Sequence, residues 1–185
     1  RRILHRHVSL ARTFDMVVLQ VLVPKEGAED AGQDTRSIQK IQEAIGRTEA
    51  FFSAIGGLHA QRGFMTWLTG RGDHLSFEMV AHRGQIKFFI VVPRDLQAYL
   101  EQQLQAQEPN AYVEEAKDYN IFSPNGAILG TTLTFKRPRF FPMKSYKKLD
   151  VDPLNAITNA MSKVVETDGA AIQLVVRSAR KEWRS

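Results

Sequence analysis

The order in which hydrophobic patterns follow one another is the feature of this sequence that most limits its fold. A dense apolar run of β-strand composition spans residues 14–23 and is closed by Pro24. Apolar residues then recur every three or four positions from Ile38 to Ile55, and Gly56-Gly57 interrupts the pattern. This spacing predicts a helix of about five turns that ends at the glycine pair.

Four more elements are predicted before residue 117. Residues 75–92 hold two strand patterns separated by Arg83-Gly84, which predicts a β-hairpin. A helical apolar face follows between Leu96 and Leu104, and a short strand is predicted at 111–116. The resulting order, β-α-β-β-α-β, is that of the ferredoxin-like split βαβ motif. Residues 64–68 are a further candidate for a short strand.

The last third of the chain predicts one more β-α-β unit. The turn-forming stretch SPNG at 123–126 precedes a predicted strand near 131–136. A helix follows that Asp152 caps and Pro153 opens, and its pattern runs to Gly169. The mostly apolar residues 171–177 are the last predicted strand.

Together these patterns predict an α+β fold, a ferredoxin-like βαββαβ core extended by a further β-α-β unit. The expected parts are a basic tail at 1–13, the ferredoxin-like domain at 14–119, and the additional unit at 120–185, packed on the first domain. The first residue is Arg rather than Met, so we expect the chain to be part of a larger protein.

The absence of cysteine excludes several classes of site. None of the 185 residues is a cysteine, so disulfides, thiolate nucleophiles and cysteine-ligated zinc or iron–sulfur centres are excluded. This composition favours a reducing, cytoplasmic setting. The apolar runs are also far shorter than the roughly 20 residues that a helix needs to cross a bilayer.

No pattern in the chain predicts catalysis. A phosphate-binding loop needs a Gly-Lys dipeptide, and the sequence contains none. His5 and His7 lie in a basic tail that would repel a metal cation, and Asp73, His74 and Ser76 are too close in sequence for the geometry of a catalytic triad. We therefore expect a chain that is not an enzyme and that carries no catalytic residue, cofactor or metal.

The one concentrated charged feature is the basic segment, residues 136–148. The chain has a net charge of +5, and this segment contains six cations, no acidic residue and three aromatic residues. Cations can neutralise phosphates while exposed aromatic rings stack on bases, which is the composition of a single-strand binder. The alternative is a basic connector whose aromatic residues pack into the core. The candidate anion or nucleic-acid contacts are Lys136, Arg137, Arg139, Lys144, Lys147 and Lys148.

Two stretches resemble a known family. The sequences FFIVVPRDLQAYLEQQLQAQEPNAYVEEAKDY at 88–119 and FPMKSYKKLDVDPLNAITNAMSKVVETDGAAIQLVVR at 141–177 are similar to the amino-terminal region of large, mostly uncharacterised bacterial proteins. Those proteins resemble the VirB/TraC-class ATPases of type IV secretion and conjugation. The resemblance extends over about residues 14–177.

This resemblance implies a role but transfers no catalytic residue. In such proteins a membrane-spanning segment commonly precedes this region, and a RecA-like motor with the phosphate loop follows it. The resemblance thus implies a non-catalytic, membrane-proximal docking or assembly domain at the inner face of the membrane. The implied partners are other domains or subunits of a secretion ATPase, with the N-terminal tail offering contact to a membrane surface. The alternative is a single-stranded nucleic-acid-binding module.

Overall fold

The computed structural model describes residues 15–23, 34–58, 64, 73–117, 119–123, 125–138, 141 and 153–178. The predicted basic tail, almost all of the strand at 64–68, and the Asp152 cap lie outside these residues. The chain divides into two compact units. Unit 1 comprises Arg1–Met79, Lys87–Asp118 and Ile172–Ser185, and unit 2 comprises Val80–Ile86 and Tyr119–Ala171.

The chain has an α+β fold, as the sequence predicts. The order of elements from the first strand to the fourth is β-α-β-β-α-β, and a helix and a strand follow. The elements are β1 (Met16–Leu22), α2 (Asp34–Gly56), β2 (His74–His82), β3 (Gln85–Pro93), the 3₁₀ turn η2 (Arg94–Leu96), α4 (Gln97–Gln107), β4 (Tyr112–Glu115), α5 (Pro153–Met161) and β5 (Gly169–Arg177).

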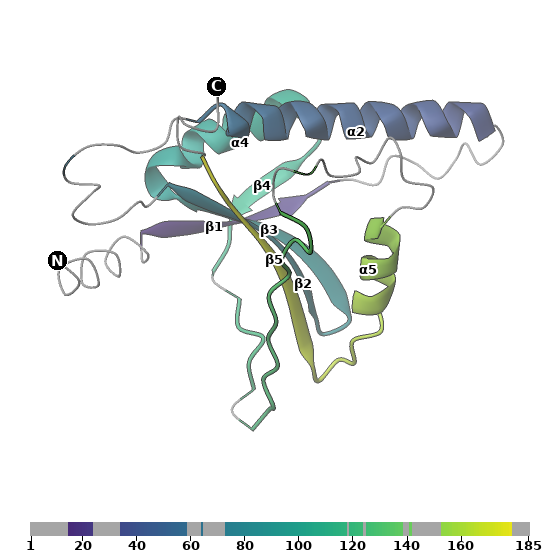
Figure 1. The fold of residues 1–185 in the computed structure, drawn as a ribbon, viewed down its shortest axis with the longest axis vertical. Coiled ribbons are helices and arrows are strands. Elements are labelled where there is room, and N and C mark those ends of the chain that lie inside the picture. Colours follow the sequence, from purple (N-terminus) through teal and green to yellow (C-terminus); the bar gives the residue numbers. More distant parts are fainter. Residues whose placement is uncertain are drawn as a thin grey trace. The chain divides into compact units, whose positions relative to one another are not determined.

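The strands form one sheet in the order β4-β1-β3-β2-β5 (Figure 1). β1 is antiparallel to both of its neighbours, with Leu19 opposite Ile90 of β3 and Glu115 of β4. Since alternate side chains of a strand share a face, Val17, Leu19 and Val21 all point into the core. Among the described residues, β4 and β5 are the edges of the sheet.

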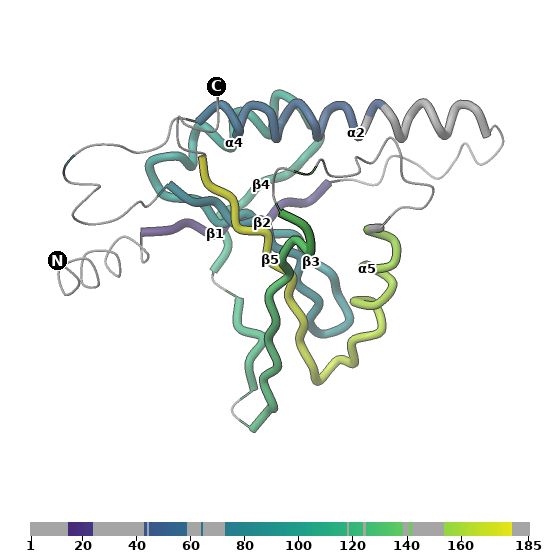
Figure 2. The backbone as a smooth tube through the Cα atoms, viewed as in Figure 1, coloured from purple at the N-terminus to yellow at the C-terminus, as the bar shows by residue number. Residues whose placement is uncertain are grey.

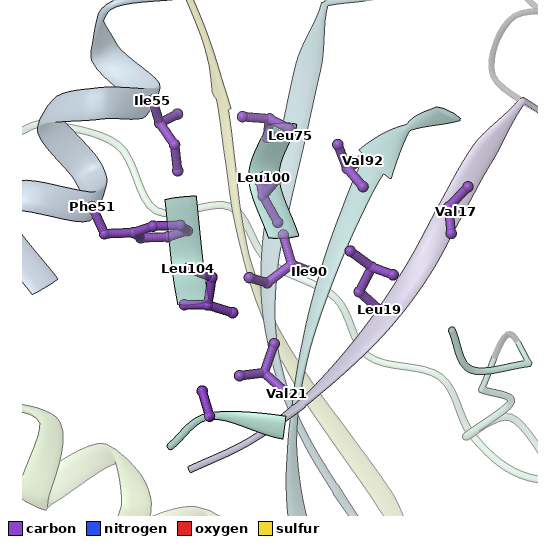
Figure 3. Packing of buried hydrophobic residues seen from close by; sticks show 11 residues of the cluster. Val17, Leu19, Val21, Phe51, Ile55, Leu75, Ile90, Val92, Leu100 and Leu104 are labelled. Atoms are coloured by element: carbon purple, nitrogen blue, oxygen red, sulfur yellow. The ribbon is translucent and has the colours of Figure 1, made fainter. Parts of the chain in front are cut away.

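The core of unit 1 forms where α2 and α4 pack on one face of the sheet. Phe51 and Ile55 of α2 lie with Leu100 and Leu104 of α4 in one buried cluster (Figure 3). The strands complete the cluster with Val17, Leu19, Val21, Leu75, Ile90 and Val92. The Tyr99 hydroxyl also donates a hydrogen bond to the carbonyl oxygen of Ala54, at 3.2 Å, which fixes one helix against the other.

The predicted hairpin is confirmed, and its turn has an unusual conformation. Arg83 and Gly84 both have positive φ angles, of 51° and 71°. Two consecutive positive φ angles are characteristic of the type I′ turn, whose twist matches that of the flanking strands. Glycine adopts this conformation readily, whereas Arg83 does so at a steric cost.

Two predictions for the last third of the chain were wrong. Residues 131–135 form no strand, because no neighbouring strand pairs with them within the described part of the chain. α5 ends at Met161 rather than near Gly169. The amides of Lys163 and Val164 donate to carbonyls only three residues back, which tightens and ends the last turn.

Other predictions agree with the structure. Gly56 is the last residue of α2, and the Gly57 amide donates to the carbonyls of Ser53 and Ala54, each at 3.1 Å. Pro153 opens α5, and the last strand extends over the predicted residues. Within the described ranges, no helix is both long and apolar enough to pass through a bilayer.

Replacing Leu100 by alanine should lower the free energy of unfolding by about 2–5 kcal/mol, because it opens a cavity in the closely packed core. The side chain of Leu100 is only 1% exposed. Leu154→Ala is the matched control, since Leu154 is 56% exposed. Urea denaturation should show a change within about 0.5 kcal/mol for the control. Equal losses for both variants would contradict the described core.

Candidate interaction surface

The surface that stands out lies on residues 119–138, which we call the arm. The arm follows β4 and belongs to unit 2. In its first leg the Phe122 amide donates to the Asn120 side chain at 2.9 Å. The chain then reverses at the predicted SPNG turn, where the Gly126 amide donates to the Ser123 carbonyl at 3.1 Å. Figure 2 shows the chain running out along one leg and returning along the other.

The arm exposes large apolar side chains. Leu129 is 96% exposed and Leu133 is 91% exposed, and Phe122, Ile128 and Phe135 are also exposed. Soluble proteins rarely leave a run of such side chains in water unless it serves as an interaction site. These apolar residues are visible in the sequence, but their exposure is not. A strand with one face in the core, as predicted near 131–136, would have buried half of them.

A close contact holds the base of the first leg. A methyl group placed on Gly169 would lie 2.6 Å from Cβ of Ile121 and 3.1 Å from its carbonyl oxygen. Backbone and a branched side chain cannot move aside cheaply, so only glycine fits at this position. Within unit 2, the start of β5 therefore packs against the first leg of the arm.

Two cations of the predicted basic segment are described, and both lie at the end of the arm. Lys136 and Arg137 are exposed. The Arg137 guanidinium lies 5.7 Å from the centre of the Phe141 ring, a cation–π distance. The Phe141 amide donates to the Pro138 carbonyl at 3.1 Å, which curls the chain so that the ring and the cation meet. Arg139, Lys144, Lys147 and Lys148 lie outside the described residues.

The β5 edge is a second exposed apolar surface. Ile172, Leu174 and Val175 are exposed although they belong to the sheet. The strand was predicted from its apolar run, but its place at the edge was not. The pairing order that makes it an edge is a long-range property, which no local pattern carries.

Hydrogen bonds between polar side chains join β2 to β5, and the Ser76 and Glu78 side chains among them are buried. The Glu78 side chain is 8% exposed, and its Oε1 accepts hydrogen bonds from the Ser76 hydroxyl at 2.7 Å and from Gln173 Nε2 at 3.0 Å. The Ser76 hydroxyl therefore donates to Glu78 and not to His74, the base that a triad would require. In the described part of the chain, no group of three or more His, Asp or Glu side chains is placed to hold a metal ion.

Glu114 and Glu115 lie on β4, the short strand that the sequence predicted at 111–116. Glu115 is 4.0 Å from Arg94, whose Nε is also 3.4 Å from the Asp15 carboxylate. These three side chains are more than half exposed, so their ion pairs contribute little stability. We assign them no chemical role.

Comparison with known proteins adds one finding. The family model described as "Domain of unknown function (DUF8128)" matches residues 24–185. No curated protein and no solved structure matches the chain.

Proposed function

This chain belongs to the DUF8128 family of domains of unknown function, and we propose that it is a non-catalytic docking domain of a type IV secretion-like ATPase. The observation that carries the proposal is the arm, which exposes large apolar side chains on both sides of an ordered turn. A partner surface that buried them would gain the free energy that the folded chain leaves unused.

The size of this gain is enough for specific binding. Burying one Leu, Ile or Phe side chain contributes about 1.5–3 kcal/mol. The arm offers Phe122, Ile128, Leu129, Leu133 and Phe135. Association itself costs several kcal/mol in lost translational and rotational freedom, so two buried side chains would be marginal, whereas four or five leave a surplus.

The kind of partner follows from the resemblance to VirB/TraC-class ATPases. In such proteins this region lies between a membrane segment and a motor, so the proposed partners are other domains or subunits of the same ATPase. An apolar contact of this kind suits a lasting assembly better than a transient encounter, because lasting interfaces are the more apolar class.

The test uses a photoactivatable cross-linking amino acid placed at Leu129 or Leu133 in the complete gene product. Irradiation should join each position to another domain or to a neighbouring subunit, because the side chains are buried there in the assembly. Mass spectrometry of the products identifies the partner. The control is the same amino acid at Gln102, an exposed position of α4. Arm positions that cross-link no more than Gln102 would contradict a docking role.

The proposal includes a place at the cytoplasmic face of the membrane. Arg1, Arg2, Arg6 and Arg12 precede the first strand, and no acidic residue occurs before Asp15. Arginines next to a membrane span mark its cytoplasmic side, and each one near an anionic leaflet contributes about 1 kcal/mol. The complete gene product should therefore sediment with membranes after cell fractionation. Recovery of the intact product in the soluble fraction would rule this placement out.

Nucleic-acid binding is the second candidate, because Lys136 and Arg137 are exposed beside an aromatic ring. If the basic segment binds a single strand, replacing Arg137, Arg139, Lys147 and Lys148 by serine should weaken binding. The slope of log affinity against log salt should fall by about 0.7 for each phosphate that the variant no longer neutralises. Fluorescence anisotropy with a labelled oligonucleotide measures both the affinity and its dependence on salt. A Lys87→Ser/Lys163→Ser variant is the control that removes exposed cations outside the segment. A salt slope that the fourfold change leaves intact would exclude this segment.

A further inference from the structure

Two unpaired surfaces of this chain complement each other. We propose that residues 127–135 of one copy add as an antiparallel strand to the outer edge of β5 in a second copy. The proposal deepens the docking function and rests on it, since it names the partner of the arm as another molecule of the same chain. Four features support the proposal: the edge of β5, the composition of residues 127–135, the charges that flank both, and the match between their apolar faces.

Within the described residues, the outer edge of β5 pairs with no strand, and it lacks the usual protection. β5 has nine residues, whereas the opposite edge strand, β4, has four. Proteins commonly guard a sheet edge with charges, proline or short strands, because its free amides and carbonyls bind other strands. From Gly169 to Val176, β5 contains neither a charge nor a proline. This edge is therefore suited to accept a strand.

The segment has the composition of a strand that lacks a sheet. In AILGTTLTF, Leu129, Leu133 and Phe135 fall on alternate positions, and β-branched residues fill most of the others. In the described part of the chain it lies in no strand and pairs with none, and its apolar side chains are exposed. A second copy of the chain would provide a strand for this segment to pair with, namely the edge strand β5.

The flanking charges select an antiparallel direction. Asp168 immediately precedes β5, and Arg177 ends it. Lys136 and Arg137 immediately follow the segment. Antiparallel pairing brings these two cations to the acidic end of β5, whereas parallel pairing brings them to Arg177. Unlike charges across the pair attract and like charges repel, so the antiparallel direction is favoured.

The hydrophobic faces then match in one register. Placing Arg137 opposite Asp168 sets Leu133 opposite Ile172 and Thr131 opposite Leu174. Ile172 and Leu174 share a face with Val176, which packs against the core cluster of unit 1. The apolar side of the added strand would thus extend that core and cover Ile172 and Leu174. A slip of one residue would turn the apolar side to the opposite face.

The existing contact at Gly169 is compatible with this pairing. Ile121 lies where a side chain of Gly169 would project, and side chains project from the faces of a sheet rather than from its edge. The contact between Ile121 and Gly169 is therefore made over a face of the sheet rather than along its edge.

Single-cysteine variants test the proposal directly, because the natural chain has no cysteine. Thr131→Cys and Leu174→Cys are prepared separately, mixed in equal amounts and oxidised. Opposite positions of paired strands lie within disulfide reach, so the mixture should form a covalent heterodimer. It should form at least about tenfold faster than the Thr131→Cys and Val165→Cys mixture, because pairing raises the local thiol concentration. Val165 is an exposed control outside β5.

Two outcomes would overturn the proposal. One is equal cross-linking of the Leu174 and Val165 mixtures. The other is a Thr131→Cys/Leu174→Cys double variant that closes only within one chain, which would assign the segment to its own sheet. The photo-cross-linking test separates the two proposals: arm positions joined to a different domain would remove this partner but keep the docking function, whereas no cross-link would remove both.

Discussion

Packing of α2 and α4 on one face of the sheet is the interaction on which the rest of the described structure depends. Leu100 and Leu104 come from one helix and Phe51 and Ile55 from the other, and they meet the inward side chains of the strands in one cluster. Each such side chain contributes about 1.5–3 kcal/mol when buried. Because β1 is hydrogen-bonded on both sides, the same core also fixes β3 and β4, and the hairpin turn then places β2.

The last strand is positioned by a polar contact as well as by apolar packing. A buried carboxylate is costly unless hydrogen bonds replace its water, and Gln173 supplies one of the bonds to Glu78. This bond requires Gln173 to lie on the same side of the sheet as Glu78. Ile172 and Leu174 must then lie on the other side, together with Val176. The hydrogen bond between Gln173 and Glu78 thus determines which apolar side chains of β5 share the face of Val176.

Most elements of the fold could be predicted because their signals are local. A period of two or 3.6 residues, a glycine pair after a helix and a proline at its start are all readable within a short window. The failure at 131–136 has a physical cause: alternation shows that residues can form a strand, but not that a neighbouring strand is present to pair with them. The early end of α5 reflects backbone geometry at Lys163 and Val164, which the apolar pattern does not encode.

The candidate site was predicted only in part, for a related reason. Composition located the basic segment, but the exposure of Leu129 and Leu133 depends on elements far away in the sequence. The pair formed by Glu78 and Gln173 was missed likewise, since its members are 95 positions apart.

The charges that flank the arm bear on why such an apolar surface can be tolerated. Exposed apolar segments invite indiscriminate association, and charged residues beside them reduce it by repelling other segments of like charge. Lys136 and Arg137 occupy this position at the end of the arm. The same cations would attract a surface that presents acidic groups, such as Glu166 and Asp168 just before β5. Apolar burial would then supply the affinity, and charge would select the partner and its direction.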